Sequence, residues 1–196
     1  MEKSDREMTV GISATACLLF AFSLLILPLK WIVAALFAAI IHEACHALAV
    51  FLCGGRIHGL KIGRNGAVME AGEIPPGRQW ICSLAGPLGS GFLVLLIPYL
   101  PRVAFCGGVH CLYNLLPLYP LDGGRVLLCL LDKLPSSKRD KVYKIIETVT
   151  LSALTVGAVY LCFWLELGWT PVFLAAVMWF RARRNSPCKE DRLGLQ

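Results

Sequence analysis

The stretch WIVAALFAAIIHEACHALAVFLC, residues 31–53, decides the fold that the sequence predicts. As a helix rising about 1.5 Å per residue, it is long enough to cross about 30 Å of hydrocarbon. Its only formally charged residue is Glu43, which lies between His42 and His46. Ionisable groups at membrane depth are costly and are usually functional. The stretch therefore predicts a membrane helix that carries a chemical site.

The polar residues of this helix follow the pattern HExxH. Positions i and i+4 lie about 40° apart on one helix face, so both imidazoles can reach a single metal ion. Glu43 comes near the open coordination position, where it can take a proton from a water whose pKa zinc lowers towards about 7. Two imidazoles leave a tetrahedral catalytic zinc one protein ligand short. The pattern predicts one zinc ion per chain, with a third ligand elsewhere.

The composition excludes an ordinary soluble domain and a disordered chain. Of the 196 residues, 57% are hydrophobic and 16% are charged, whereas soluble domains have about 45–50% and about 25%. The spacing of the charged residues predicts six transmembrane helices in a single domain over residues 1–196. The predicted spans are residues 10–29, 31–53, 80–99, 103–121, 145–165 and 167–180.

The basic residues predict the orientation of these spans. With six crossings, 17 of the 19 lysines and arginines fall on the face that holds both termini, and only Lys30 and Arg102 fall on the other. Basic residues accumulate on the cytoplasmic side. We therefore expect a multi-pass protein of the cell membrane with cytoplasmic N- and C-termini. Orientation and contact with the lipid bilayer account for the net charge of +6 without a nucleic-acid partner.

Residues 54–78, between the second and third spans, are rich in glycine. The pair Asn65 and Gly66 is a turn signal between two apolar runs, which is typical of a β-hairpin. The expected fold class is thus an all-α multi-pass membrane protein with a short cytoplasmic β-hairpin.

Three acidic residues near membrane depth are candidates for the third metal ligand. Glu166 falls on the far face of the membrane, whereas Asp122 ends a span that runs in the same direction as the helix of the two histidines. Glu147 also starts at the cytoplasmic face, but Lys144 at i−3 offers it an ordinary charge partner. Asp122 is therefore preferred, and Glu147 stays open as the ligand of a zincin-type membrane protease.

The segment before Asp122 contains polar and helix-breaking residues. Pro117 and Pro120 remove backbone donors and bend the span, and irregular backbone in a membrane belongs beside a cavity or a substrate. Asn114 carries an amide that can hold a peptide group or an oxyanion. Its alternative role is a hydrogen bond between helices.

Together these residues resemble the signatures of the site-2 protease family (M50) of intramembrane metalloproteases. HExxH stands at residues 42–46 and NxxPxxPxDG at residues 114–123, and the resemblance covers roughly residues 31–125. A weaker element matches at Ala85, Gly86 and Pro87, although Ser90 stands where the family often has asparagine. The resemblance implies roles for seven residues: zinc binding for His42, His46 and Asp122, water activation for Glu43, and substrate positioning for Asn114, Pro117 and Pro120.

The compact group of this family, typified by the stage IV sporulation protease, is the most similar. That group often ends in a cystathionine β-synthase (CBS) module, which we do not expect within residues 1–196. The resemblance implies a zinc-dependent endopeptidase that cleaves a membrane-spanning or membrane-associated protein segment near the cytoplasmic face. A regulatory membrane partner and a role in sporulation rest on the analogy alone. A non-proteolytic metal transporter or scaffold is the alternative from another class.

Overall fold

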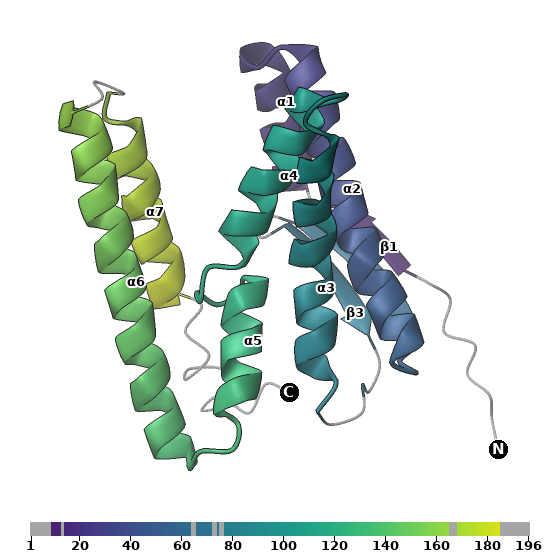
Figure 1. Cartoon of the computed structure of the whole chain (residues 1–196), viewed down its shortest axis with the longest axis vertical. Coiled ribbons are helices and arrows are strands. Elements are labelled where there is room, and N and C mark those ends of the chain that lie inside the picture. The colour runs from purple at the N-terminus through teal and green to yellow at the C-terminus, as the bar shows by residue number, and fades with distance from the viewer. Residues whose placement is uncertain are drawn as a thin grey trace. The chain divides into compact units, whose positions relative to one another are not determined.

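The computed structural model describes residues 9–12, 14–63, 66–71, 74, 77–164 and 168–184. The chain divides into two compact units, Met1–Tyr113 and Asn114–Gln196. In chain order (Figure 1), the elements are β1 (Thr9–Ile12), α1 (Ala14–Ile26), α2 (Leu29–Leu52), β2 (Ile57–Gly63), β3 (Gly66–Ala71), α3 (Gln79–Phe92), η1 (Leu93–Leu96), α4 (Pro101–Asn114), α5 (Asp122–Leu131), α6 (Ser136–Trp164) and α7 (Thr170–Arg184).

In the first unit, α2 and α3 pack against each other. Four buried residues, Ala49, Val50, Cys53 and Cys82, form a core between the end of α2 and the start of α3. Further along α3, a side chain at Gly89 would collide with the Sγ atom of Cys45 on α2. Because glycine has no Cβ, the two helices can approach closely at that position.

A three-stranded sheet in the first unit has the order β1-β2-β3. Strands β2 and β3 are antiparallel, with Leu60 opposite Met69. The expected turn at Asn65 and Gly66 falls partly outside the described residues, since Asn65 is not among them. Strand β1 pairs in parallel with β2, so the sheet has one strand more than the expected hairpin.

Strand β1 also corrects the expectation for the first span. The sequence predicts one helix over residues 10–29, but residues 9–12 are a strand and α1 begins only at Ala14. The reason is that the backbone of β1 pairs with β2, and its residues Thr9, Val10 and Ile12 are β-branched and favour strands. With 13 residues, α1 is about 20 Å long.

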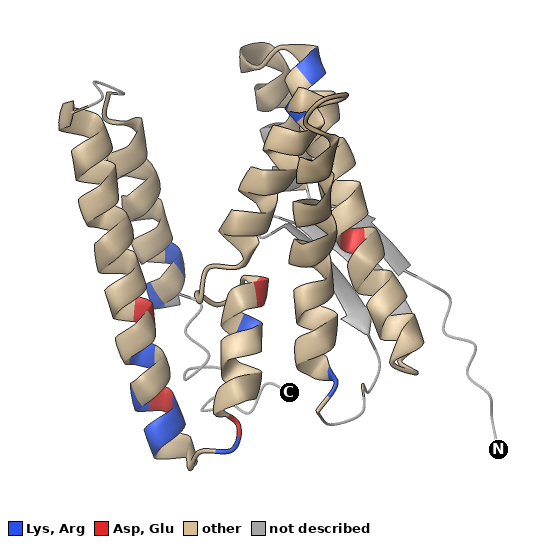
Figure 2. Ribbon diagram, viewed as in Figure 1, with Lys and Arg blue, Asp and Glu red and all other residues tan. Residues whose placement is uncertain are grey.

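Three helical stretches in the described part of the chain are long and apolar enough to cross a membrane: Leu29–Leu52, Gln79–Leu96 and Ser136–Trp164. They overlap the predicted spans 31–53, 80–99 and 145–165, although α6 already begins at Ser136. Along α6, the charged residues lie in the first half and the rest of the helix carries none (Figure 2).

The predicted span 103–121 is not one helix. Helix α4 ends at Asn114 and α5 begins at Asp122, because Pro117 and Pro120 cannot donate the backbone hydrogen bonds of a continuing helix. For the predicted span 167–180, the structure has α7 at Thr170–Arg184, and residues 165–167 lie outside the described part.

Many large apolar side chains are exposed on these helices. Examples are Leu25 on α1, which is 84% exposed, Phe51 on α2 at 75% and Trp164 on α6 at 75%. Soluble proteins rarely expose extended apolar surfaces of this kind. The exposed apolar surface, together with the three long apolar helices, indicates an integral membrane protein.

In the second unit, α6 and α7 lie side by side (Figure 1). Leu118, Leu151 and Ala182 form the buried core of this unit. The segment between α4 and α5 is held to α6 by a hydrogen bond, in which the backbone N–H of Tyr119 donates to the hydroxyl oxygen of Tyr143 over 2.7 Å. This segment is therefore irregular in conformation but anchored by both apolar and polar contacts.

Candidate metal centre

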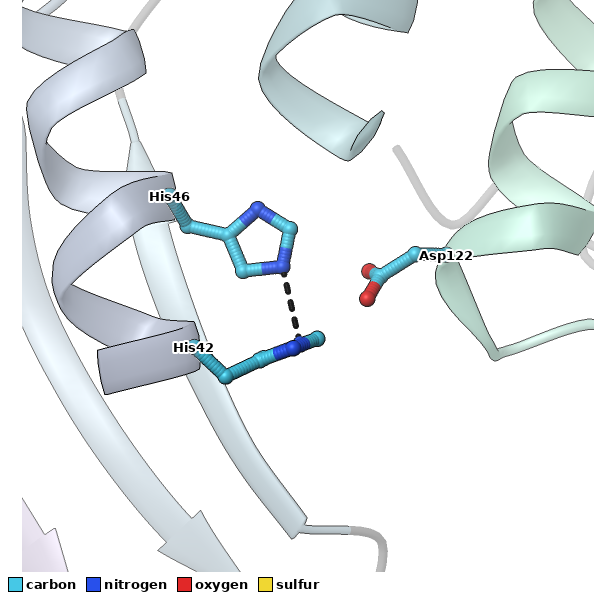
Figure 3. A group of neighbouring side chains, drawn as sticks. All are labelled: His42, His46 and Asp122. Carbon is cyan, nitrogen blue, oxygen red and sulfur yellow. Dashed lines mark hydrogen bonds between the residues drawn. The ribbon is translucent and has the colours of Figure 1, made fainter. Parts of the chain in front are cut away.

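His42 and His46 lie one turn apart on α2, as the i, i+4 spacing predicts. Their rings meet edge to face, with centroids 4.7 Å apart and planes at 84°. The two Nε2 atoms are 3.1 Å apart, the contact drawn as a dashed line in Figure 3. His42 is only 3% exposed and His46 is partly buried, so the contact lies at a partly buried position.

The spacing of the two nitrogens fits one metal ion. Zinc binds histidine nitrogens at about 2.0–2.1 Å in tetrahedral geometry, which places two such ligands about 3.3 Å apart. The observed 3.1 Å between the Nε2 atoms is close to this value. The imidazoles are therefore already arranged to share a small divalent cation.

The outer nitrogen of His46 is bound to α3. Its Nδ1 atom lies 2.7 Å from the carbonyl oxygen of Cys82. A carbonyl oxygen can only accept, so Nδ1 of His46 carries a hydrogen. Metal-binding histidines commonly make such a bond, which fixes the orientation of the ring.

Gly86 provides the space for the ring of His46. A Cβ atom at position 86 would collide with Nε2 of His46, and the other ring atoms Cδ2 and Cε1 would lie only 2.5 and 2.6 Å from it. The weak AGP element of the sequence thus has a steric role at this site. The spacing of Cys82, Gly86 and Ser90, four residues apart each time, places all three on one face of α3 and is the sequence signal for this contact.

Glu43 and His110 are neighbours of His42 in the first unit. Glu43 follows His42 on α2 and is partly exposed, which leaves its carboxylate able to exchange protons. His110 on α4 lies against His42, with ring centroids 4.5 Å apart and planes at 82°. From the sequence, His110 lies one helical turn before Asn114 and is expected to pack or hydrogen-bond, with contact to substrate as the alternative. The structure shows that it contacts a predicted metal ligand.

Asp122 is the first residue of α5 in the second unit. It is 7% exposed, and a carboxylate in the first turn interacts favourably with the helix dipole. A side chain at Gly123 would collide with the carbonyl oxygen of Leu115, and one at Gly124 would come within 2.6 Å of the Tyr119 nitrogen. The two glycines therefore let the preceding segment fold back directly onto the start of α5.

The other predicted residues of this segment are partly buried. Asn114 is the last residue of α4, and Pro117 and Pro120 lie in the irregular segment that follows. Tyr119–Pro120 is a cis peptide bond. All three residues belong to the second unit, as does Asp122.

His42 and His46 lie in the first unit, whereas Asp122 and Glu147, the two candidates for the third ligand, lie in the second. The role of Asp122 as third ligand and the identity of the metal belong to the function proposed below.

Long apolar helices and an HExxH histidine pair are features of the membrane metalloproteases. Comparison with known proteins agrees with this class. Residues 14–106 match the model of the Peptidase M50B-like family. The chain is also similar in structure to the Site-2 Protease from Methanocaldococcus jannaschii, with a TM-score of 0.61, 19% sequence identity, and 95% of this chain and 94% of that chain covered.

No curated protein sequence matches the chain. The family match and the shared fold nevertheless confirm the resemblance to the site-2 proteases, and they support a metalloendopeptidase.

Proposed function

We propose that this protein is a zinc-dependent intramembrane endopeptidase that cleaves a membrane-spanning or membrane-associated segment of another protein near the cytoplasmic face. The observation that carries the proposal is the pair of Nε2 atoms of His42 and His46, which lie 3.1 Å apart at a partly buried position. This spacing suits two ligands of one zinc ion. The Peptidase M50B-like match over residues 14–106 supports peptide-bond hydrolysis as the chemistry.

In this proposal, His42, His46 and Asp122 hold the zinc ion, one per chain. Zinc, when bound, would act as a Lewis acid that polarises the scissile carbonyl and makes water a stronger nucleophile. Glu43 takes a proton from the attacking water and delivers it to the leaving amide nitrogen. The side-chain amide of Asn114 donates a hydrogen bond to the oxygen on which negative charge develops.

Substrate access is proposed to depend on extended backbone, because a helical substrate hides its carbonyl groups. Pro117 and Pro120 keep the segment before Asp122 irregular, and this segment can lie along an unwound peptide. Strand β3 lies at one end of the order β1-β2-β3, so its outer edge can take up a substrate strand by β-addition. Replacing Val68 and Met69 with proline should then reduce cleavage, whereas unchanged cleavage would remove β3 from the proposal.

We also propose six membrane crossings with cytoplasmic termini. The support is the distribution of basic residues, 17 of 19 on one face. Reporter domains fused after residue 30 and after residue 102 should both be exported. A cytoplasmic reporter at either position would contradict this topology.

The experiment that tests the function is co-expression of the wild-type protein and Glu43→Gln with candidate membrane-tethered substrates. Glutamine keeps the size of the side chain but cannot accept the proton of water. A protease should lose cleavage in Glu43→Gln and keep its zinc content. A transporter or scaffold should be nearly indifferent to the substitution, and cleavage by Glu43→Gln at the wild-type rate would contradict the proposed role of the residue.

A further inference from the structure

The imidazole of His42 contacts α3 through Ser90. Ser90 is completely buried, at 0% exposed, and its Oγ atom lies 3.3 Å from Nδ1 of His42. The same oxygen lies 3.1 Å from the carbonyl oxygen of Pro87 and 3.2 Å from that of Gly86. The proteolytic steps proposed above make no use of this serine.

The hydrogen bonds of Ser90 determine the direction of its contact with His42. A hydroxyl group has one hydrogen to donate and two lone pairs that accept. The carbonyl oxygens of Gly86 and Pro87 only accept, so they take the hydroxyl hydrogen. With that hydrogen directed at the carbonyls, the Ser90 oxygen offers a lone pair to His42, and the 3.3 Å contact favours a hydrogen on Nδ1 of His42. The lone pair of the neutral ring then lies on Nε2, the atom that faces His46.

The outer nitrogen of His46 is bound to the same helix. Its Nδ1 atom donates to the carbonyl oxygen of Cys82, two turns before Ser90 on α3. Gly86 lies between these two positions and leaves the space that the His46 ring occupies. One face of α3 thus holds the outer nitrogen of both imidazoles.

We propose that Ser90 is a positioning residue that fixes His42 in the tautomer with its lone pair on Nε2. With the Cys82 carbonyl, it directs the Nε2 atoms of both imidazoles towards one point. The inference rests on the metal site of the proposed function. A serine suits this position because α2 and α3 approach closely beside it, at Gly86 and Gly89, and its hydroxyl is short.

The ring of His110 supports His42 from α4. The two rings pack edge to face with centroids 4.5 Å apart, which limits rotation of the His42 ring about its bond to Cβ. Ser90 therefore determines which nitrogen carries the hydrogen, and His110 helps to hold the plane of the ring.

The first test reads the tautomer directly and needs no variant of Ser90. The full chain is labelled with ¹⁵N-histidine and studied by NMR in detergent micelles, metal-free and with zinc added. The four histidines are assigned with His46→Gln, His58→Gln and His110→Gln. We expect the hydrogen of His42 on Nδ1 in both states. A hydrogen on Nε2 in the metal-free protein would overturn the proposal.

The second test measures zinc affinity by chelator competition. Ser90→Ala should bind zinc about 10- to 100-fold more weakly, the usual effect of losing such a partner. Ser83→Ala is the matched control, because it makes the same change two turns earlier on α3 and should leave the affinity unchanged. Wild-type affinity in Ser90→Ala, or equal losses in Ser90→Ala and Ser83→Ala, would contradict a specific role for Ser90.

The two tests also separate this inference from the proposed function. If the wild-type chain binds no zinc at all, the proposed protease fails, and the NMR measurement still decides the tautomer of His42. If zinc binds and His42 carries its hydrogen on Nε2, the Ser90 inference fails while the protease stands.

Discussion

At the scale of single residues, the site depends on a position without a side chain as well as on the predicted ligands. Position 86 is the clearest case, because the ring of His46 occupies the space of a side chain there. The histidines were predictable from HExxH, since the pattern itself carries the chemistry. The contact between Gly86 and the His46 ring was not predictable, because a sequence does not show which helix the histidines face.

Gly86→Ala should displace the His46 ring and weaken zinc binding by about 10-fold or more, with an overpacking cost of about 1–3 kcal/mol. Chelator competition and thermal unfolding in detergent measure the two effects. Gly157→Ala is the control, since a Cβ at that position of α6 meets no atom of the described residues within 4 Å. It should leave zinc binding unchanged, and an unchanged zinc affinity in Gly86→Ala would show that the close approach of Gly86 to His46 does not matter for the site.

The third ligand is tested by comparing two carboxylates. Asp122→Ala should lose stoichiometric zinc and cleavage, because two imidazoles alone leave the ion one protein ligand short. Glu147→Gln should keep its zinc and its cleavage activity. Glu147 is 6% exposed and its Oε1 atom has no hydrogen-bond partner within the described part of the chain, so the isosteric amide should be tolerated. Zinc content and cleavage are measured for both variants. Loss of zinc and cleavage in Glu147→Gln but not in Asp122→Ala would favour the zincin-type alternative.

At the scale of elements, the segment between α4 and α5 is the part that sequence reasoning described least well. Pro117 and Pro120 indicated a bend, but the hydropathy of residues 103–121 resembles one continuous span. The break from Asn114 to Asp122 depends on packing that is not local: the Leu118 side chain joins the core of α6 and α7, and Gly124 admits the backbone of Tyr119. Strand β1 was missed for a similar reason, since its partner β2 lies about 50 residues further along the chain.

Tyr143→Phe should loosen this segment. Tyr143 is 1% exposed and its hydroxyl oxygen accepts the backbone hydrogen of Tyr119, so its removal takes this hydrogen bond from a partly buried donor at a cost of about 1 kcal/mol. We expect a lower unfolding temperature and slower cleavage. Tyr160→Phe, on the same helix but 56% exposed, should change neither. Equal stability of the two variants would show that the hydrogen bond does not anchor the segment.

At the scale of the whole molecule, composition and charge spacing predicted a helical membrane protein, and the three long apolar helices agree with that class. The sequence resemblance covered residues 31–125, whereas the structural similarity to the archaeal site-2 protease extends over 95% of the chain. Spacing between charges is set by the thickness of the bilayer, which explains why it finds apolar helices well. The spacing of charged residues does not show where a helix ends. Helix α6 begins at Ser136, earlier than the predicted start at residue 145, because its charged first turns are helical as well.

Removal of the metal should stop cleavage without unfolding the protein. The core of α2 and α3 is built from Ala49, Val50, Cys53 and Cys82, and none of these residues is a proposed metal ligand. A chelator should therefore abolish cleavage and leave the helical circular dichroism nearly unchanged, and added zinc should restore activity. Loss of helical signal on chelation would mean that the ion has a structural role.

The central claim is that His42, His46 and Asp122 hold one divalent ion, and the most direct test is the metal content of the purified full chain. Elemental analysis should find one zinc per chain in the wild type and in Glu43→Gln, and far less in Asp122→Ala. A wild-type protein that holds no stoichiometric metal under any condition that supports cleavage would contradict the account.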